Sequence, residues 1–251
     1  MFGEGLGYAA WVETMSEAIK PHKERSLRRS LGLVVGGLAA ATALIVGFAP
    51  SIGHTIAMGG HTESQARAEV VVGNDVLTVP LNMIRSPTAR STGTASRLDL
   101  YWRWPALDGY SEAARGDFNN ADGSRNIVFA TIEPRGMSRD MSGRLEPVYA
   151  PLLEDGVSEG PAGLSVRNLR RDSGYTDETL VVGPAEGGAR FVARCLAGPA
   201  AETSLAPCER DLFIGKSLSL TYRFPKSLLG NWRELDGRIR ERAASLLPEA
   251  G

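Results

Sequence analysis

Two cysteines are the residues of this chain best placed to form a bond with each other. Cys195 and Cys208 stand at the end of one predicted strand and the start of the next. The two arms of a hairpin would bring them together, and a disulfide is the natural state of such a pair in an oxidising compartment. A metal site needs more ligands, and the CxxC spacing of redox-active pairs is absent. The sequence therefore predicts a structural disulfide.

Histidine, the usual general base, is scarce. The chain contains His22, His54 and His61, and no histidine follows residue 61. A Ser-His-Asp or Cys-His site needs a histidine in the folded domain, and so do the common zinc sites. No phosphate-binding G-x-x-x-x-G-K-[ST] loop is present, and no G-x-G-x-x-G follows a strand. We therefore expect no metal and no cofactor.

Three weaker patterns could also indicate a catalytic or metal-binding site. Lys216 and Lys226 each neighbour a serine, but adjacent residues of a strand point to opposite faces, which argues against a Ser–Lys dyad at the first. Residues 117–123 hint at a calcium loop but lack its ligands at the fifth and twelfth positions. Paired carboxylates of the glycosidase type are compatible with the sequence, although nothing positively supports them. We predict a protein that is not an enzyme.

An uncharged apolar run lies upstream of these residues. Residues 31–50 read LGLVVGGLAAATALIVGFAP, which is long enough to span a bilayer. Basic residues gather just before the run, and none follows it until Arg67. The positive-inside rule then places the N-terminus in the cytoplasm and the rest outside. The alternative is a signal peptide cleaved near residues 66–68, although its apolar run would normally be shorter.

The topology predicted from this run is a single-pass protein of the inner (plasma) membrane, in contact with the lipid bilayer. Its expected parts are a cytoplasmic tail at 1–30, a transmembrane helix at 31–53, a linker at 54–68 and a periplasmic globular domain at 69–248. Small residues recur at four-residue steps in the run, at Gly32, Gly36 and Ala40. Such spacing lets helices approach closely in lipid, so these residues are a candidate helix–helix contact of a homo-oligomer.

Alternating hydrophobicity predicts strands over most of the outer domain. Residues 97–104 and 217–224 each place apolar side chains on one face only. Gly73 and Gly174 lie in turn sequences between apolar runs, as in hairpins. From Leu228 onward, apolar residues at steps of three or four predict an amphipathic helix. The predicted fold class is α+β, with one N-terminal transmembrane helix and a mostly antiparallel β-rich domain closed by that C-terminal helix.

The strand at 97–104 also carries a candidate partner-binding surface. Tyr101 shares one face of the strand with Asp99 and Arg103, and an exposed aromatic residue among charged ones is typical of a binding surface. Trp102 and Trp104 lie on the opposite, apolar face and are expected in the core. The net charge of −1 gives no overall attraction to nucleic acid, so we expect no such partner.

Several sequence segments together resemble an uncharacterised family of transmembrane-anchored proteins from alphaproteobacteria. The segments are LTVPLNMIR, RLDLYWRWP, GYTDETL, FVARC and LSLTYRFP, the last followed by a helix that contains tryptophan. The resemblance covers about residues 69–245. It implies an inner-membrane protein with a periplasmic domain and brings no catalytic residue.

Three functions fit the sequence. The first is a non-enzymatic envelope assembly or scaffold factor that binds another envelope protein. The second is a tethered periplasmic enzyme that uses carboxylates, or a ligand-binding domain. The third is a signal-relay subunit that passes an outer event to residues 1–30. A deep polar cleft with carboxylates of raised pKa would favour the second function, and a flat apolar patch would favour the first.

Overall fold

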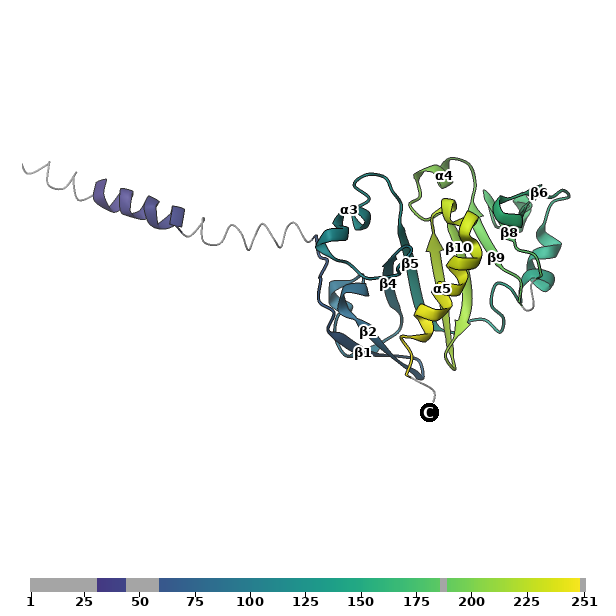
Figure 1. Cartoon of the computed structure of the whole chain (residues 1–251), viewed down its shortest axis with the longest axis horizontal. Coiled ribbons are helices and arrows are strands. Elements are labelled where there is room, and N and C mark those ends of the chain that lie inside the picture. Colours follow the sequence, from purple (N-terminus) through teal and green to yellow (C-terminus); the bar gives the residue numbers. More distant parts are fainter. Residues whose placement is uncertain (1–30, 44–58, 186–188, 249–251) are drawn as a thin grey trace, which may run out of the picture. The chain divides into compact units, whose positions relative to one another are not determined.

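The computed structural model describes residues 31–43, 59–185 and 189–248. The chain divides into two units, Met1–Gly59 and Gly60–Gly251. In the first unit, residues 31–43 form a helix (Figure 1). None of the helices within the described ranges has the length and apolar character needed to cross a bilayer. The predicted tail 1–30 and the remainder of the predicted span, 44–53, lie outside the described residues.

A small three-stranded sheet opens the second unit, in the order β2-β1-β3. Its first two strands form the hairpin predicted around Gly73, which adopts a positive φ of 58° in the two-residue turn. The third strand runs parallel to the first. The strands are β1 (Arg67–Val72), β2 (Asp75–Pro80) and β3 (Gly93–Ala95).

A larger sheet of eight strands follows, in the order β4-β5-β11-β10-β9-β8-β7-β6 (Figure 1). Every neighbouring pair in it is antiparallel. The predicted hairpins around residues 172–174 and around the cysteine loop are present as β7–β8 and β9–β10. The strands are β4 (Leu98–Arg103), β5 (Ile127–Pro134), β6 (Ser158–Glu159), β7 (Ser165–Asn168), β8 (Glu178–Val182), β9 (Val192–Leu196), β10 (Cys208–Ile214) and β11 (Leu218–Phe224).

Helical segments in the second unit are mostly single turns. Among the described residues of this unit, the α-helices are α3 (Arg115–Phe118), α4 (Gly198–Thr203) and α5 (Trp232–Ala244). The 3₁₀ and π segments are η1 (Leu81–Met83), η2 (Pro87–Ala89), η3 (Glu112–Ala114), η4 (Leu145–Tyr149), η5 (Ala150–Leu152), η6 (Pro161–Gly163), η7 (Arg171–Ser173) and η8 (Lys226–Asn231).

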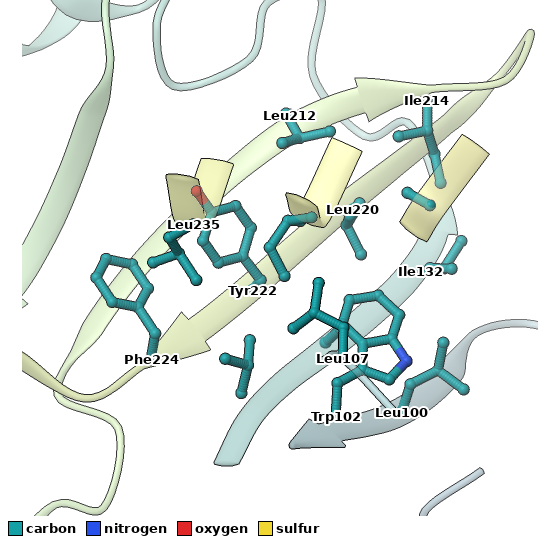
Figure 2. Close-up of a cluster of buried hydrophobic side chains, with 14 of the residues drawn as sticks. Leu100, Trp102, Leu107, Ile132, Leu212, Ile214, Leu220, Tyr222, Phe224 and Leu235 are labelled. Carbon is teal, nitrogen blue, oxygen red and sulfur yellow. The ribbon is translucent and has the colours of Figure 1, made fainter. Parts of the chain in front are cut away.

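The main core lies against one face of the large sheet and includes side chains of α5 and of the small sheet. Even-numbered residues of β4, β5, β10 and β11 point toward it, among them Trp102, Leu220 and Tyr222 (Figure 2). From α5, Leu235 and Ile239 are fully buried against them. The prediction that Trp102 is a core residue is therefore confirmed. The odd-numbered residues of the same four strands must lie on the opposite face of the sheet.

The predicted fold class, α+β with an N-terminal transmembrane helix, is wrong. The described residues form mostly β-sheet with few helices, and no described helix could cross a membrane. The C-terminal helix does form, as α5, but most of the other helical segments close after one turn. The physical reason is visible in the composition, because 29 glycines and 14 prolines interrupt the connections between strands.

Candidate functional site

A groove lies on the face of the large sheet that α5 leaves uncovered. Its floor follows from strand register. Asp99, Thr131 and Thr221 stand side by side on β4, β5 and β11. The next row on the same face contains Phe129 and Arg223, which are direct partners in the ladder. Because same-face residues recur about every 7 Å along a strand, these two rows form a continuous floor that is polar apart from Phe129.

The groove encloses about 510 Å³. Arg85 and Arg97, from the segments before β4, contribute to its lining together with Glu133 at the far end of β5. Residues 204–206, just before β10, complete the lining. Leu205 among them is 44 % exposed.

The predicted disulfide between Cys195 and Cys208 is present, with an S–S distance of 2.06 Å. The two residues are direct partners in the β9–β10 ladder, and both are buried. The disulfide joins the two ends of the loop that contains α4 and residues 204–206. It therefore restrains the loop that lines one part of the groove.

One carboxylate of the groove is engaged by its neighbours. Arg97 donates to Oδ2 of Asp99 through Nε and Nη2, at 3.1 and 2.9 Å. The hydroxyl of Thr131 donates to the other oxygen of Asp99 at 2.8 Å. These contacts fill much of the capacity of Asp99 to accept hydrogen bonds.

A second carboxylate, Glu209, is engaged by Arg194. The guanidinium of Arg194 lies 2.8 Å from Glu209 and 3.1 Å from Glu178. Burial lowers the pKa of Arg194, but the attraction of both carboxylates outweighs it and raises the net pKa above the ordinary value. Arg194 therefore stays charged, bridging the two carboxylates beside a smaller cavity of about 190 Å³ that Arg223 also lines.

Three charged side chains of the groove have no opposite charge bound to them within the described part of the chain. Arg223 and Glu133 form neither a side-chain hydrogen bond nor an ion pair there. Arg85 forms no ion pair there, and its guanidinium carbon lies 5.3 Å from the centre of the Phe129 ring. These are the groups of the groove that remain available to a ligand.

The candidate surface predicted at Asp99, Tyr101 and Arg103 is only partly brought together. Asp99 lines the groove, but Tyr101 is only 2 % exposed, so it is not a surface residue. Its ring lies under Phe118, with centroids 4.9 Å apart. The Arg103 guanidinium is engaged by Asp108 at 2.9 Å. Strand alternation indicated the correct face but not the segments that fold over it.

His61 packs in the folded domain, although the sequence pattern placed every histidine in the tail or linker. Its ring stacks on Tyr110 with centroids 4.5 Å apart, and its Nδ1 lies 3.0 Å from the Tyr101 hydroxyl. Burial lowers the pKa of His61 and the positive charge of Arg90 lowers it further, while a hydrogen bond with Asn119 opposes both. No hydrophobic period marks this residue, so the sequence held no signal for its position.

The small-residue stripe Gly32, Gly36 and Ala40 lies in the helix at 31–43. A contact between such helices stays a prediction. For metals, no group of three or more His, Cys, Asp or Glu side chains in the described segments could hold an ion.

A buried ion pair on the opposite side of the sheet was also missed by the sequence pattern. Arg210 of β10 is fully buried, and its Nε donates to Asp236 of α5 at 2.9 Å. The hydroxyl of Tyr222 donates to the same oxygen at 2.8 Å. Burial raises the pKa of Asp236, but Arg210 and Arg240 outweigh it and hold the net pKa below the ordinary value. This network attaches α5 to the sheet and lies away from the groove.

Comparison with known proteins gives little beyond this geometry. No protein-family model and no curated protein matches the sequence. Among solved structures, the crystal structure of the Neisseria meningitidis iron-regulated outer membrane lipoprotein FrpD is similar with a TM-score of 0.45 and 10 % sequence identity. The match covers 74 % of this chain and 95 % of that one.

Proposed function

We propose that this protein is a non-enzymatic binding protein whose groove receives an extended segment of another protein. The volume of about 510 Å³ falls within the range of roughly 300–1,000 Å³ typical of ligand sites. The supporting observation is the mixture of opposite charges in one groove. The lining combines three arginines with three carboxylates, namely Arg85, Arg97, Arg223, Asp99, Glu133 and Glu209.

Charge composition favours a polypeptide over other ligand classes. A phosphate-rich polymer would be repelled by Asp99, Glu133 and Glu209, because like charges facing each other disfavour binding. A sugar would need an open aromatic face for stacking, but the guanidinium of Arg85 lies over the ring of Phe129. A polypeptide carries both charges, apolar side chains and backbone groups that the hydroxyl of Thr221 can bind.

A carboxylate-based enzyme is the weaker proposal. Asp99 and Glu209 are both engaged by arginine, and a catalytic pair would need carboxylates free to exchange protons with a substrate. An apolar patch is expected of a scaffold factor, but the groove is polar. We therefore propose that it binds its partner through charged side chains. A role in relaying a signal to residues 1–30 has no support from the groove.

The proposal puts the domain outside the cytoplasm, in the periplasm, as an envelope assembly factor. The buried disulfide supports this location, because such bonds persist in oxidising compartments. The resemblance to inner-membrane proteins with a periplasmic domain agrees with it.

Site-directed photocrosslinking in cells that express the full chain tests the proposal. A benzophenone amino acid would replace Thr221 in the groove or, as a matched control, the exposed Ala244 of α5. We expect position 221 to crosslink one defined segment of a protein and position 244 to leave that segment unlabelled. A synthetic peptide with the sequence of that segment should compete. Identical products from both positions, or none from position 221, would refute the proposal.

A further inference from the structure

We propose that the groove selects its ligand by the spacing of two opposite charges. Arg85 and Arg223, which both line the groove near Phe129, bind a carboxylate of the extended segment. Glu133 binds a basic side chain four residues away on the same segment. This inference rests on the proposed function of the groove and adds the chemical class of segment that it accepts.

Both arginines line the groove in the part of it that contains Phe129. Arg223 is the ladder partner of Phe129, and the guanidinium carbon of Arg85 lies 5.3 Å from the centre of that ring. Neither forms an ion pair with any residue that the structure describes. A carboxylate bound by both guanidinium groups offsets the repulsion between their like charges and accepts charge-assisted hydrogen bonds from each. The apolar ring also lowers the local dielectric, which strengthens the attraction.

The nearest carboxylate in the ladder does not satisfy Arg223. Glu209 is the direct partner of Arg223 on β10, yet its ion pair is with Arg194, at 2.8 Å. Asp99, in the neighbouring row, is bound by Arg97 and Thr131. A ligand carboxylate can therefore bind the Arg223 guanidinium on the floor of the groove without first breaking an ion pair.

The opposite end of the groove carries Glu133. It lies four residues from Phe129 on the same face of β5, which corresponds to about 13 Å along the strand. The arginine at the neighbouring position, Arg97, is bound to Asp99 and leaves Glu133 free. An extended polypeptide has the same rise per residue as the strand beneath it. A ligand lying along β5 therefore matches both ends of the groove with an acidic and a basic residue four positions apart.

Between the two ends, the floor offers hydroxyl groups. Thr131 and Thr221 are adjacent in the ladder, and the Thr221 hydroxyl forms no hydrogen bond with the described residues. A hydroxyl both donates and accepts, so it can bind the backbone of any sequence. The groove is then expected to select particular ligand residues at its charged ends and to accept any residue between them.

A randomised dodecapeptide library displayed on phage tests this inference with purified full-length protein. We expect the selected peptides to share Asp or Glu four positions from Lys or Arg, whatever the residues between. For a selected peptide, replacing the acidic residue with its amide should weaken binding about tenfold or more, since a charge-assisted hydrogen bond is lost. The variants Arg223→Gln and Arg85→Gln should reduce the difference in affinity between the acidic peptide and its amide. Glu133→Gln should reduce only the preference for the basic residue.

Matched controls separate this inference from the proposed function. Arg171→Gln removes an exposed arginine of η7 away from the groove and should change neither preference. Each variant should keep the thermal unfolding midpoint of the wild type, because the replaced side chains are exposed and form no ion pair with the residues that the structure describes. Selected peptides that bind the groove without the charge pair would overturn the inference alone. Failure of every peptide to bind would overturn the proposed function with it.

Discussion

The carboxylate of Asp75 accepts a hydrogen bond from the hydroxyl of Ser217 at 2.7 Å, across 142 positions of sequence. It also accepts the backbone N–H groups of Lys216 and Ser217, at 3.1 and 3.0 Å. Asp75 opens β2 of the small sheet, and Ser217 immediately precedes β11 of the large one. This buried carboxylate therefore joins the two sheets at the turn before the strand that forms the groove floor.

Replacing this carboxylate should destabilise the domain. Asp75→Ala leaves two backbone donors without partners, and we expect it to lower the free energy of unfolding by about 3 kcal/mol. Ser217→Ala removes one of the three hydrogen bonds and should cost about 1 kcal/mol. Urea denaturation followed by tryptophan fluorescence measures both. Equal losses in the two variants would contradict a role for the backbone contacts.

The ion pair beneath α5 should respond asymmetrically to mutation. Asp236→Ala leaves Arg210 buried without its carboxylate, and removing one partner of a buried pair typically costs about 3–5 kcal/mol. Arg210→Met should cost less, because Asp236 keeps Arg240, at 3.0 Å, and the Tyr222 hydroxyl. The double variant should then be more stable than Asp236→Ala alone. Denaturant unfolding of the three proteins provides the comparison, and a double variant that is the least stable would reject this reasoning.

The disulfide should stabilise both the domain and the lining of the groove. The double variant Cys195→Ala/Cys208→Ala should lower the free energy of unfolding by about 3 kcal/mol, as expected for a loop of this length. Hydrogen exchange should rise in residues 196–207 more than in β7 or β8, because the bond joins the ends of that loop. Unchanged exchange there would show that the loop is held by other contacts.

Folding stability should fall as the pH drops through the ordinary pKa of histidine. Burial lowers the pKa of His61 in the folded state, and Arg90 lowers it further. The unfolded chain therefore takes up the proton first, and protonation favours unfolding below about pH 6.5. His61→Gln should flatten the dependence of unfolding free energy on pH between about 7.5 and 5.5. If the unfolding free energy of His61→Gln depends on pH as steeply as that of the wild type, other titrating groups cause the dependence.

Local patterns explain which parts of this structure could be predicted. The hairpin at Gly73 and the cysteine pair follow from residues close in sequence, and both are present. The pairing of β5 with β11 joins residues about ninety positions apart, and no local pattern specifies it. The placement of Arg223 beside Phe129 therefore follows from this register and from no local pattern.

Filling the groove tests the central claim most directly. Thr221→Trp places a large ring on the floor of the groove, and Ala244→Trp places the same ring on the exposed side of α5. The measurement is the affinity of each full-length variant for the segment that crosslinks at position 221. We predict at least about a tenfold loss of affinity for Thr221→Trp, as for blocked central contacts of an interface, and no change for Ala244→Trp. Equal affinity in both variants would show that the groove is not the binding site.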